Sequence, residues 1–295
     1  AFNGGKMSSP FISVIIPTYN RSSIVLRALK SVLDQTYTNF EVWIVDDGST
    51  DESFQVINWY INKNQLADKV HLLKTTNRGV SAARNEALKK SSGEWIALLD
   101  SDDEWMPDKL QSQIDYVAQN PQVPLVHGEE IWIRNGTRVN AMRKHKKFGG
   151  KIFEKCLPLC LISPSASMIR RSVLADMNGF DESFTVCEDY DLWLKITSQY
   201  EVGFIEKPLI RKFGGHSDQL SRQYKAMDYY RVKSMDGVYK NGNLKNEWKV
   251  SLKKQLIRKC EILLKGYKKY QNFENFDEIS GLKKEYHNLL VTHEA

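Results

Sequence analysis

The sequence contains few cysteines, and their spacing does not match a metal site. Its 295 residues include four of them: Cys156, Cys160, Cys187 and Cys260. None forms a Cys-x-x-Cys pair, and no histidine cluster lies beside them, which argues against a zinc site. Because no signal peptide precedes these cysteines, we expect reduced thiols and a cytoplasmic protein.

Long apolar runs and glycine-rich nucleotide motifs are also missing. No apolar run approaches the roughly 18 residues of a transmembrane helix. The absence of Gly-x-Gly-x-x-Gly argues against a nicotinamide or flavin cofactor, and the absence of Gly-x-x-x-x-Gly-Lys-Ser/Thr excludes a P-loop ATPase. The net charge of +6 is mild, so it fits an anionic ligand or surface without indicating nucleic acid.

The residues that are present indicate a folded α/β protein. Hydrophobic residues make up 41% of the chain and aromatic residues 11%, enough for a sizeable core. Residues 1–10 start without Met and are interpreted as a tag remnant or disordered terminus. Between residues 11 and 120, short apolar runs that fit strands alternate with stretches of helical periodicity. This alternation predicts a Rossmann-like, mostly parallel twisted sheet with helices on both faces.

Local signals predict the limits of several elements. Ser49 and Glu52 have the spacing of a capping box for the helix that follows them. Pro107 suits the first helical position of another helix. Beyond residue 120, Asn135-Gly136 predicts the turn of a β-hairpin.

Residues 221–295 are interpreted as a basic helical extension. Residues 222–269 contain 14 Lys or Arg against 4 Asp or Glu. One stripe of this region is apolar: Trp248, Leu252, Leu256 and Cys260. Two alternatives fit the stripe: packing on the rest of the protein with the lysines solvated, or peripheral contact with anionic lipid at the inner face of the membrane.

Polar clusters directly follow four of the predicted strands. They are Thr18-Tyr19-Asn20, Asp46-Asp47, Asn77-Arg78 and Asp100-Ser101-Asp102-Asp103. Ligands of parallel sheets bind beyond the carboxyl ends of the strands, which meet at one edge. A single ligand could therefore contact all four clusters.

The last of these clusters places three carboxylates within four residues. An Asp-rich turn between strand and helix is the simplest interpretation. The alternative is a bound cation, because carboxylates this close repel one another unless a positive charge lies among them. Oxygen ligands suit Mg²⁺ or Mn²⁺, which take further ligands from a substrate diphosphate. This alternative predicts a ligand that carries a diphosphate.

Asp46, Asp47 and Arg84 each have a structural and a functional interpretation. The capped helix start after the two aspartates does not need both of them, so one could accept hydrogen bonds from a nucleobase or a ribose. Arg84 lies one turn into a predicted helix, where a basic residue opposes the helix dipole. Its guanidinium is either solvated or in contact with a nucleotide or the nearby aspartates.

Asp189 is the candidate general base. At helical spacing it continues an apolar stripe that includes Trp193, with Glu188 and Asp191 turned away. Complementarity to the helix dipole accounts for an acid in a first turn. A carboxylate that opens onto a cleft could instead accept a proton from a substrate.

His216 follows two glycines in a predicted loop. A histidine in such a loop is commonly exposed to solvent. The alternative is that the loop folds over a ligand and brings His216 to a metal or a phosphate.

Six ordered stretches resemble the family 2 glycosyltransferases, which have the GT-A fold. They are SVIIPTYNR, VDDGSTD, NRGVSAARN, LLDSDDEW, NGFDESF and CEDYDLWLK. The resemblance implies a glycosyltransferase domain over residues 11–220, in which 11–120 bind the nucleotide and 121–220 the acceptor. It implies inverting transfer of a hexose from a nucleotide-diphosphate sugar, by analogy a UDP-sugar, to a glycan or lipid-linked acceptor in polysaccharide or glycoconjugate synthesis.

The resemblance also implies roles for individual residues. The family's nucleotide contacts fall on Pro17, Thr18, Tyr19, Asp47 and Arg84. Its Asp-x-Asp motif falls on Asp100, at ribose or a metal-bound water, and on Asp102, which would ligate Mn²⁺ or Mg²⁺. Asp189 falls on the general base. From the residues alone, and not from the resemblance, His216 is a candidate further metal ligand and Asp103 is expected to be structural.

Two alternatives to a transferase are weighed against these residues. A catalytically silent nucleotide-sugar or glycan-binding module could lose the aspartates that catalysis needs, and all of them are present here. A nucleotidyltransferase would need a Gly-rich loop after the first strand, and PTYNRSS contains no glycine. No Gln-x-x-Arg-Trp motif follows CEDYDLWLK, which argues against a processive synthase. The oligomeric state is left open.

Overall fold

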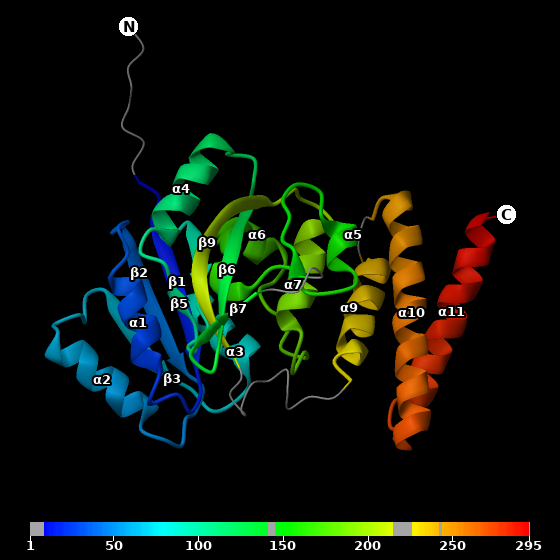
Figure 1. Cartoon of the computed structure of the whole chain (residues 1–295), viewed down its shortest axis with the longest axis horizontal. Helices are drawn as coiled ribbons and strands as arrows, with labels where there is room; N and C mark the ends of the chain where they lie inside the picture. The colour runs from blue at the N-terminus through cyan, green and yellow to red at the C-terminus, as the bar shows by residue number, and fades with distance from the viewer. Residues whose placement is uncertain (1–8, 141–144, 215–225, 242–243, 295) are drawn as a thin grey trace, which may run out of the picture.

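The computed structural model describes residues 9–140, 145–214, 226–241 and 244–294. A nine-stranded sheet runs through this part of the chain, with helices packed against it (Figure 1). The strand order is β3-β2-β1-β4-β8-β6-β9-β5, and β7 pairs with β6 outside this path. Figure 1 shows α2 and α11 at opposite ends of the molecule.

The first half of the chain alternates strands and helices as predicted. Its elements are β1 (Ile12–Thr18), α1 (Val25–Leu33), β2 (Phe40–Asp46), α2 (Ser53–Lys63), β3 (Val70–Lys74), α3 (Val80–Lys90), β4 (Trp95–Leu98), β5 (Glu104–Trp105) and α4 (Lys109–Gln119). Strands β3, β2, β1 and β4 pair in parallel. Because β1 lies between β2 and β4, the polar residues after these strands reach the same edge of the sheet.

The second half completes the sheet with mixed pairing. Its elements are β6 (Leu125–Arg134), β7 (Thr137–Val139), α5 (Phe153–Cys156), a 3₁₀ turn (Pro164–Ala166), β8 (Met168–Arg170), α6 (Arg171–Asp176), α7 (Glu188–Thr197) and β9 (Gly203–Gly214). Strand β9 pairs in parallel with β6, whereas β8, β7 and β5 run antiparallel to their neighbours. The predicted α/β class is confirmed, with parallel pairing concentrated in β3-β2-β1-β4.

Strands β1, β2, β4, β6 and β8 contribute residues to two cores, one on each face of the sheet. In β1, Ile12, Val14 and Ile16 pack with side chains of α1, α2 and α4. Ile15 points the other way, into a core that includes residues of α3, α5 and α7. The predicted helices on both faces follow from this alternation, since side chains of a strand point to opposite faces in turn.

The predicted capping box is wrong. The Ser49 hydroxyl accepts a hydrogen bond from the backbone N–H of Asn20 at 2.9 Å, so it belongs to the turn after β2. Helix α2 begins later, at Ser53, and the Asp51 carboxylate accepts the Ser53 N–H at 2.9 Å. The spacing fits a cap, but the chain makes a further turn before the helix begins.

The other two local signals had different outcomes. Helix α4 begins at Lys109, so Pro107 lies just before the helix and not at its first position. The Asn135-Gly136 turn is confirmed: it joins β6 to β7, with φ of 48° and 76° at its two residues. Asn and Gly are the residues that tolerate such left-handed backbone best, which is why the pair is a reliable hairpin signal.

The last helices are α9 (Asp228–Asn241), α10 (Asn246–Tyr270) and α11 (Phe276–Glu294). The apolar stripe of α10 is buried in the same core as α5 and α7. For example, the rings of Trp248 and Phe153 lie 5.1 Å apart. This supports packing over membrane insertion for that stripe. The limit at residue 220 stays a prediction. No described helix has both the length and the apolar character that a membrane span requires.

Two lysines of α10 are buried, so the expectation that its lysines are solvated is wrong for them. The ammonium of Lys253 donates to the carbonyl of Leu289 at 2.8 Å. The ammonium of Lys259 pairs with Asp228 at 2.8 Å. These contacts tie α10 to α11 and to α9, because each lysine lies on a side of α10 that another helix covers.

Burial of His127 makes the stability of the fold depend on pH. This β6 side chain is fully buried, and burial lowers its pKa from 6.5 to about 4. The unfolded chain binds a proton near pH 6.5 that the folded protein takes up only near pH 4. The contribution of His127 to the free energy of unfolding should therefore be fully present above pH 6.5 and fall by about 3 kcal/mol as the pH drops to 4.

Urea unfolding at several pH values measures this dependence. We expect His127→Gln to remove this contribution from the pH dependence between pH 6.5 and 4. Equal pH slopes in the wild type and His127→Gln would contradict the prediction.

Candidate active site

The predicted nucleotide contacts lie at the ends of β1 and β2. Thr18 and Asp46 are paired in register across these strands, and the carbonyl of Thr18 accepts the Asp47 N–H at 2.9 Å. Pro17 and Thr18 are buried, whereas the side chain of Tyr19 is 42% exposed. The strand pairing thus brings four of the five predicted nucleotide contacts together, the fifth being Arg84 on α3.

The Asp47 carboxylate is already bonded to the loop before α3. One oxygen accepts the backbone N–H of Arg78 at 3.0 Å and the hydroxyl of Thr75 at 3.2 Å. The other oxygen accepts the N–H of Gly79 at 2.7 Å. A ligand at Asp47 would have to share these bonds. Its role as a nucleotide contact stays a prediction, beside a role in shaping the loop that the structure shows.

Two buried polar atoms next to this edge lack partners among the described residues. They are the Thr18 hydroxyl oxygen and the second carboxylate oxygen of Asp46. The first oxygen of Asp46 accepts the Ser49 N–H at 2.7 Å. Buried polar atoms are nearly always hydrogen-bonded, and exceptions concentrate where a water, an ion or a ligand is missing.

Arg84 joins the end of β4 to the start of α7. Its side chain is only 2% exposed, and its two terminal nitrogens donate to Asp100 at 2.8 Å and to Glu188 at 2.7 Å. Burial alone would lower the pKa of Arg84, but the two carboxylates raise it, so the guanidinium stays charged. Of the two predicted alternatives, solvation is wrong, and contact with the nearby aspartate cluster is what the structure shows.

The predicted orientation of α7 is wrong. Glu188 and Asp191 are buried, and Asp189 is the partly exposed member of the three. The helix is enclosed by α5, by α9 and by Arg84, so more than one of its faces is interior. Burial and the neighbouring Asp189 raise the pKa of Glu188 to about 7, against the attraction of Arg84.

Asp189 is accessible and has a partner on each oxygen. One oxygen accepts the N–H of Tyr190 at 2.7 Å. The other lies 3.3 Å from the thiol sulfur of Cys160. This position, beside the Arg84–Glu188 pair but partly exposed, allows Asp189 to meet a substrate hydroxyl.

The carboxylates after β4 differ in their surroundings. Asp103 is buried, and its oxygens accept the hydroxyl of Ser165 at 2.6 Å and the N–H of Phe213 at 3.1 Å. Burial raises the pKa of Asp103 well above its usual range. These contacts agree with the structural role expected for Asp103. Asp100 and Asp102 are partly exposed.

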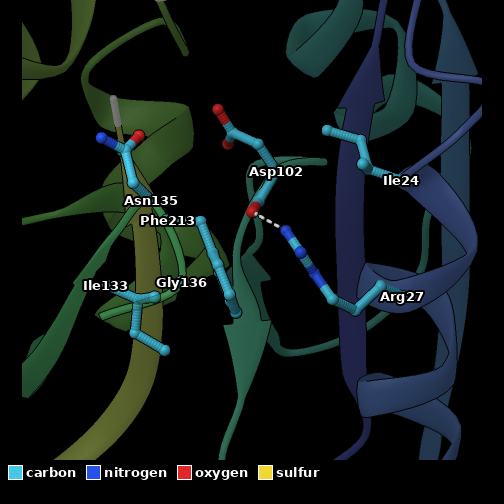
Figure 2. Close-up of a pocket in the computed structure, with 8 residues that line it drawn as sticks. Ile24, Arg27, Asp102, Ile133, Asn135, Gly136 and Phe213 are labelled. Carbon is cyan, nitrogen blue, oxygen red and sulfur yellow. Dashed lines mark hydrogen bonds between the residues drawn. The ribbon is translucent and has the colours of Figure 1, made fainter. Parts of the chain in front are cut away.

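A pocket of about 270 Å³ opens beside Asp102. It lies between α1, the β6–β7 turn and the end of β9, and Figure 2 shows Asp102 between Asn135 and Ile24. The Arg27 guanidinium donates to the backbone carbonyl of Asp102 and lies 3.7 Å from the centre of the Phe213 ring. The pocket therefore joins the two halves of the chain at the predicted metal ligand.

A divalent cation fits this donor set if a substrate supplies ligands. Among the described residues, no group of three His, Cys, Asp or Glu side chains could hold a metal. Asp100 gives one oxygen to Arg84, and the role of Asp102 as the metal ligand stays a prediction. Mg²⁺ and Mn²⁺ are commonly bound by one or two carboxylates plus phosphate oxygens and water. His216 lies outside the described residues, so its role stays a prediction.

Comparison with a family model settles the family. The model of glycosyl transferase family 2 matches residues 13–177, more than half of the chain. The chain belongs to glycosyltransferase family 2. The resemblance inferred from the six sequence stretches is thus confirmed. The matched region contains the candidate nucleotide contacts and Asp102 but ends before Glu188, Asp189 and His216.

Relatives of this family 2 glycosyltransferase differ in length. The chain is 33% identical over 200 residues to the UDP-Glc:alpha-D-GlcNAc-diphosphoundecaprenol beta-1,3-glucosyltransferase of Escherichia coli. The aligned region covers 68% of this chain and 74% of that protein. An uncharacterized glycosyltransferase of Rickettsia bellii is 33% identical over 67% of this chain but only 28% of its own length. The chain spans about a third or less of its relatives from Rickettsia bellii, Rickettsia conorii and Rickettsia felis.

Solved structures confirm the fold. Staphylococcus aureus TarS 1-349 with UDP-GlcNAc superposes with a TM-score of 0.67 over 94% of this chain and 91% of that chain, at 19% identity. A mannosyltransferase of Pyrobaculum calidifontis with GDP-Man and Mn²⁺ gives 0.62 over 97% and 84%, at 18% identity. At such identities the likeness concerns the fold alone, which is GT-A as expected.

Some side chains in the site of this glycosyltransferase carry no signal in the sequence. Cys160 and Ser165 contact carboxylates of the site, but both lie in an irregular stretch without periodicity. The ammonium of Lys212, on β9, attracts the carboxylates of both Asp100 and Asp189. A basic residue on a strand usually indicates a solvated side chain, so only the folded arrangement reveals these three.

Proposed function

We propose that this glycosyltransferase moves a sugar with inversion from a nucleotide-diphosphate sugar, a UDP-sugar by preference, to a hydroxyl of a glycan or lipid-linked acceptor. The observation that carries the proposal is the pairing of one buried guanidinium, Arg84, with Asp100 and Glu188. It brings the candidate donor end of the site next to the candidate base Asp189, as direct displacement requires.

The chemistry needs a donor bound at one side and a base at the other. Asp189 takes the proton of the acceptor hydroxyl. The oxygen of that hydroxyl bonds to the anomeric carbon, and the bond from that carbon to the diphosphate breaks. A divalent cation, when bound, neutralises charge on the departing diphosphate. Asp102 would hold that cation, and Thr18 and Asp47 would lie beside the nucleoside.

The name of the Escherichia coli relative supports a lipid-linked acceptor, because that enzyme acts on a sugar joined to diphosphoundecaprenol. Such an acceptor would fit a cytoplasmic protein that meets the inner face of a membrane and contributes to cell-surface polysaccharide. A membrane contact would have to use exposed residues, since the apolar stripe of α10 is buried.

Calorimetry with nucleotide diphosphates tests the donor site. We expect UDP to bind with Mn²⁺ present and at least about 10-fold more weakly after chelation, since a charge-bridging cation is worth more than about 1 kcal/mol. Asp102→Ala should bind UDP equally with and without Mn²⁺. Asp115→Ala, at an exposed position of α4, is the control and should behave as the wild type.

Calorimetry combined with an assay of UDP release from the donor separates an enzyme from a silent binding module. Metal-dependent donor binding together with release of UDP in the presence of acceptor supports the transferase. Donor binding without UDP release in the presence of any lipid-linked or free glycan acceptor would support the binding module. Full metal dependence of UDP binding in Asp102→Ala would contradict the assignment of Asp102 as the metal ligand.

A further inference from the structure

In the stretch 160–165, which is buried from residue 161 onward, each carbonyl from residue 161 lies within hydrogen-bond distance of a donor. The donors to the carbonyls of 161, 162, 163, 164 and 165 are, in order, Lys147 Nζ (2.7 Å), Cys160 Sγ (3.4 Å), Ala166 N (3.1 Å), Ser167 N (2.9 Å) and Trp105 Nε1 (2.8 Å). Irregular backbone is stable in an interior only when its polar groups are satisfied. This 160–165 segment is therefore held in one conformation.

One end of the 160–165 segment contacts the candidate base. The sulfur of Cys160 lies 3.3 Å from an oxygen of Asp189. Burial raises the pKa of the Cys160 thiol well above its usual value, so the thiol keeps its proton and acts as the donor. The carbonyl of Ile162, 3.4 Å from the same sulfur, is the second acceptor within reach of that one proton.

The other end contacts the carboxylates after β4. The hydroxyl of Ser165 donates to Asp103 at 2.6 Å and accepts the backbone N–H of Asp100 at 3.1 Å. The middle is fixed by a cation from another strand, because Lys212 Nζ lies 3.1 Å from the hydroxyl of Ser163. One short segment thus touches both ends of the proposed reaction site.

We infer that the 160–165 segment positions the base relative to the donor end of the site, Cys160 by orienting Asp189 and Ser165 by fixing the turn that carries Asp100 and Asp102. The inference rests on the proposed function. Reacting groups must be held to a fraction of an ångström, and this depends on supporting hydrogen bonds. Arg84 ties the same two elements together at a second point.

Variants of Cys160 test the end at the base. Cys160→Ala should lower kcat about 5-fold, the contribution of one hydrogen bond, with both KM values within about 2-fold of the wild type. Cys160→Ser keeps a donor and should restore kcat to within about 2-fold. Cys160 is partly exposed, so both variants are expected to fold, and thermal melting confirms it.

Variants of Ser165 test the donor end, with Ser198 as the control. Ser165→Ala should raise the donor KM and the Mn²⁺ concentration for half-maximal activity about 5-fold, while kcat at saturation stays within about 2-fold. Ser198→Ala removes a buried hydroxyl at the end of α7 that donates to the Lys195 carbonyl at 2.7 Å and belongs to neither the 160–165 segment nor the carboxylate cluster, so it should change neither quantity. If Ser165→Ala does not fold, Ser165→Cys replaces it, because the thiol keeps a hydrogen-bond donor. Its donor KM and its Mn²⁺ requirement should rise by less than the 5-fold expected for Ser165→Ala.

Three results would overturn the inference: an unchanged kcat in Cys160→Ala, a Cys160→Ser variant as slow as Cys160→Ala, or equal effects of Ser165→Ala and Ser198→Ala. Failure of the proposed function is recognised separately. If Asp189→Asn transfers sugar at the wild-type rate, the base assignment fails first. If Asp189→Asn is inactive and Cys160→Ala is normal, only the positioning role fails.

Discussion

Asp189→Asn should lower the rate of sugar transfer roughly 10³-fold, which is within the usual contribution of a general base. Asn has nearly the same shape and can still accept the Tyr190 N–H that Asp189 accepts at 2.7 Å. It cannot take a proton from the acceptor hydroxyl at neutral pH. Binding of UDP and Mn²⁺ should stay within about 2-fold of the wild type, because Asp189 is not placed among the donor contacts.

Single-turnover transfer and UDP calorimetry on the same preparations measure the two quantities. Asp191→Asn is the control on the same helix: burial raises the pKa of Asp191, and its carboxylate pairs with Lys195 away from the site. It should keep transfer within about 3-fold, as expected of a change that spares the reacting groups. Wild-type transfer by Asp189→Asn would refute the base assignment. Loss of UDP binding as well would move Asp189 to the donor site.

The parts of the fold that the sequence predicts are those with a local cause. The apolar runs after residue 11 become strands β1 to β4, because the residues of a buried strand pack on two faces at once. Asn135-Gly136 becomes a turn because few other pairs adopt positive φ at low energy. The gathering of Thr18, Asp47 and Asp100 at one edge follows from parallel pairing.

The parts that the sequence does not predict depend on neighbours from distant positions. A helical stripe predicts one buried face, but α7 is also covered by α9 and α5, which buries Glu188 and Asp191. The residues around Arg84 in the sequence give no reason for its burial, and only Asp100 and Glu188 explain it. Contacts of this kind connect residues that have no periodic relation, so no pattern in the sequence records them.

Arg84→Met should destabilise the protein more than any other single change in the site. It leaves Glu188 and Asp100 without the guanidinium that they share, and breaking a buried ion pair by removing one partner costs about 3–5 kcal/mol. For a chain of this size the melting temperature should fall on the order of 10 °C. The melting temperature of Arg84→Lys should lie between those of the wild type and Arg84→Met, because one ammonium does not span both carboxylates as the planar guanidinium does.

The double variant Arg84→Met/Glu188→Gln separates charge from packing. A neutral glutamine side chain at position 188 no longer needs a cation, so about half of the lost stability should return, whereas transfer should stay low because the link from Asp100 to α7 is still missing. Arg78→Met is the control, since this half-exposed guanidinium pairs with Glu86 and Glu182 at the surface, and should cost less than about 1 kcal/mol. Equal melting temperatures of Arg84→Met and Arg78→Met would show that the buried pairing does not hold the site together. Recovery of transfer in the double variant would show that charge at Glu188, and not the link between the two elements, limits the reaction.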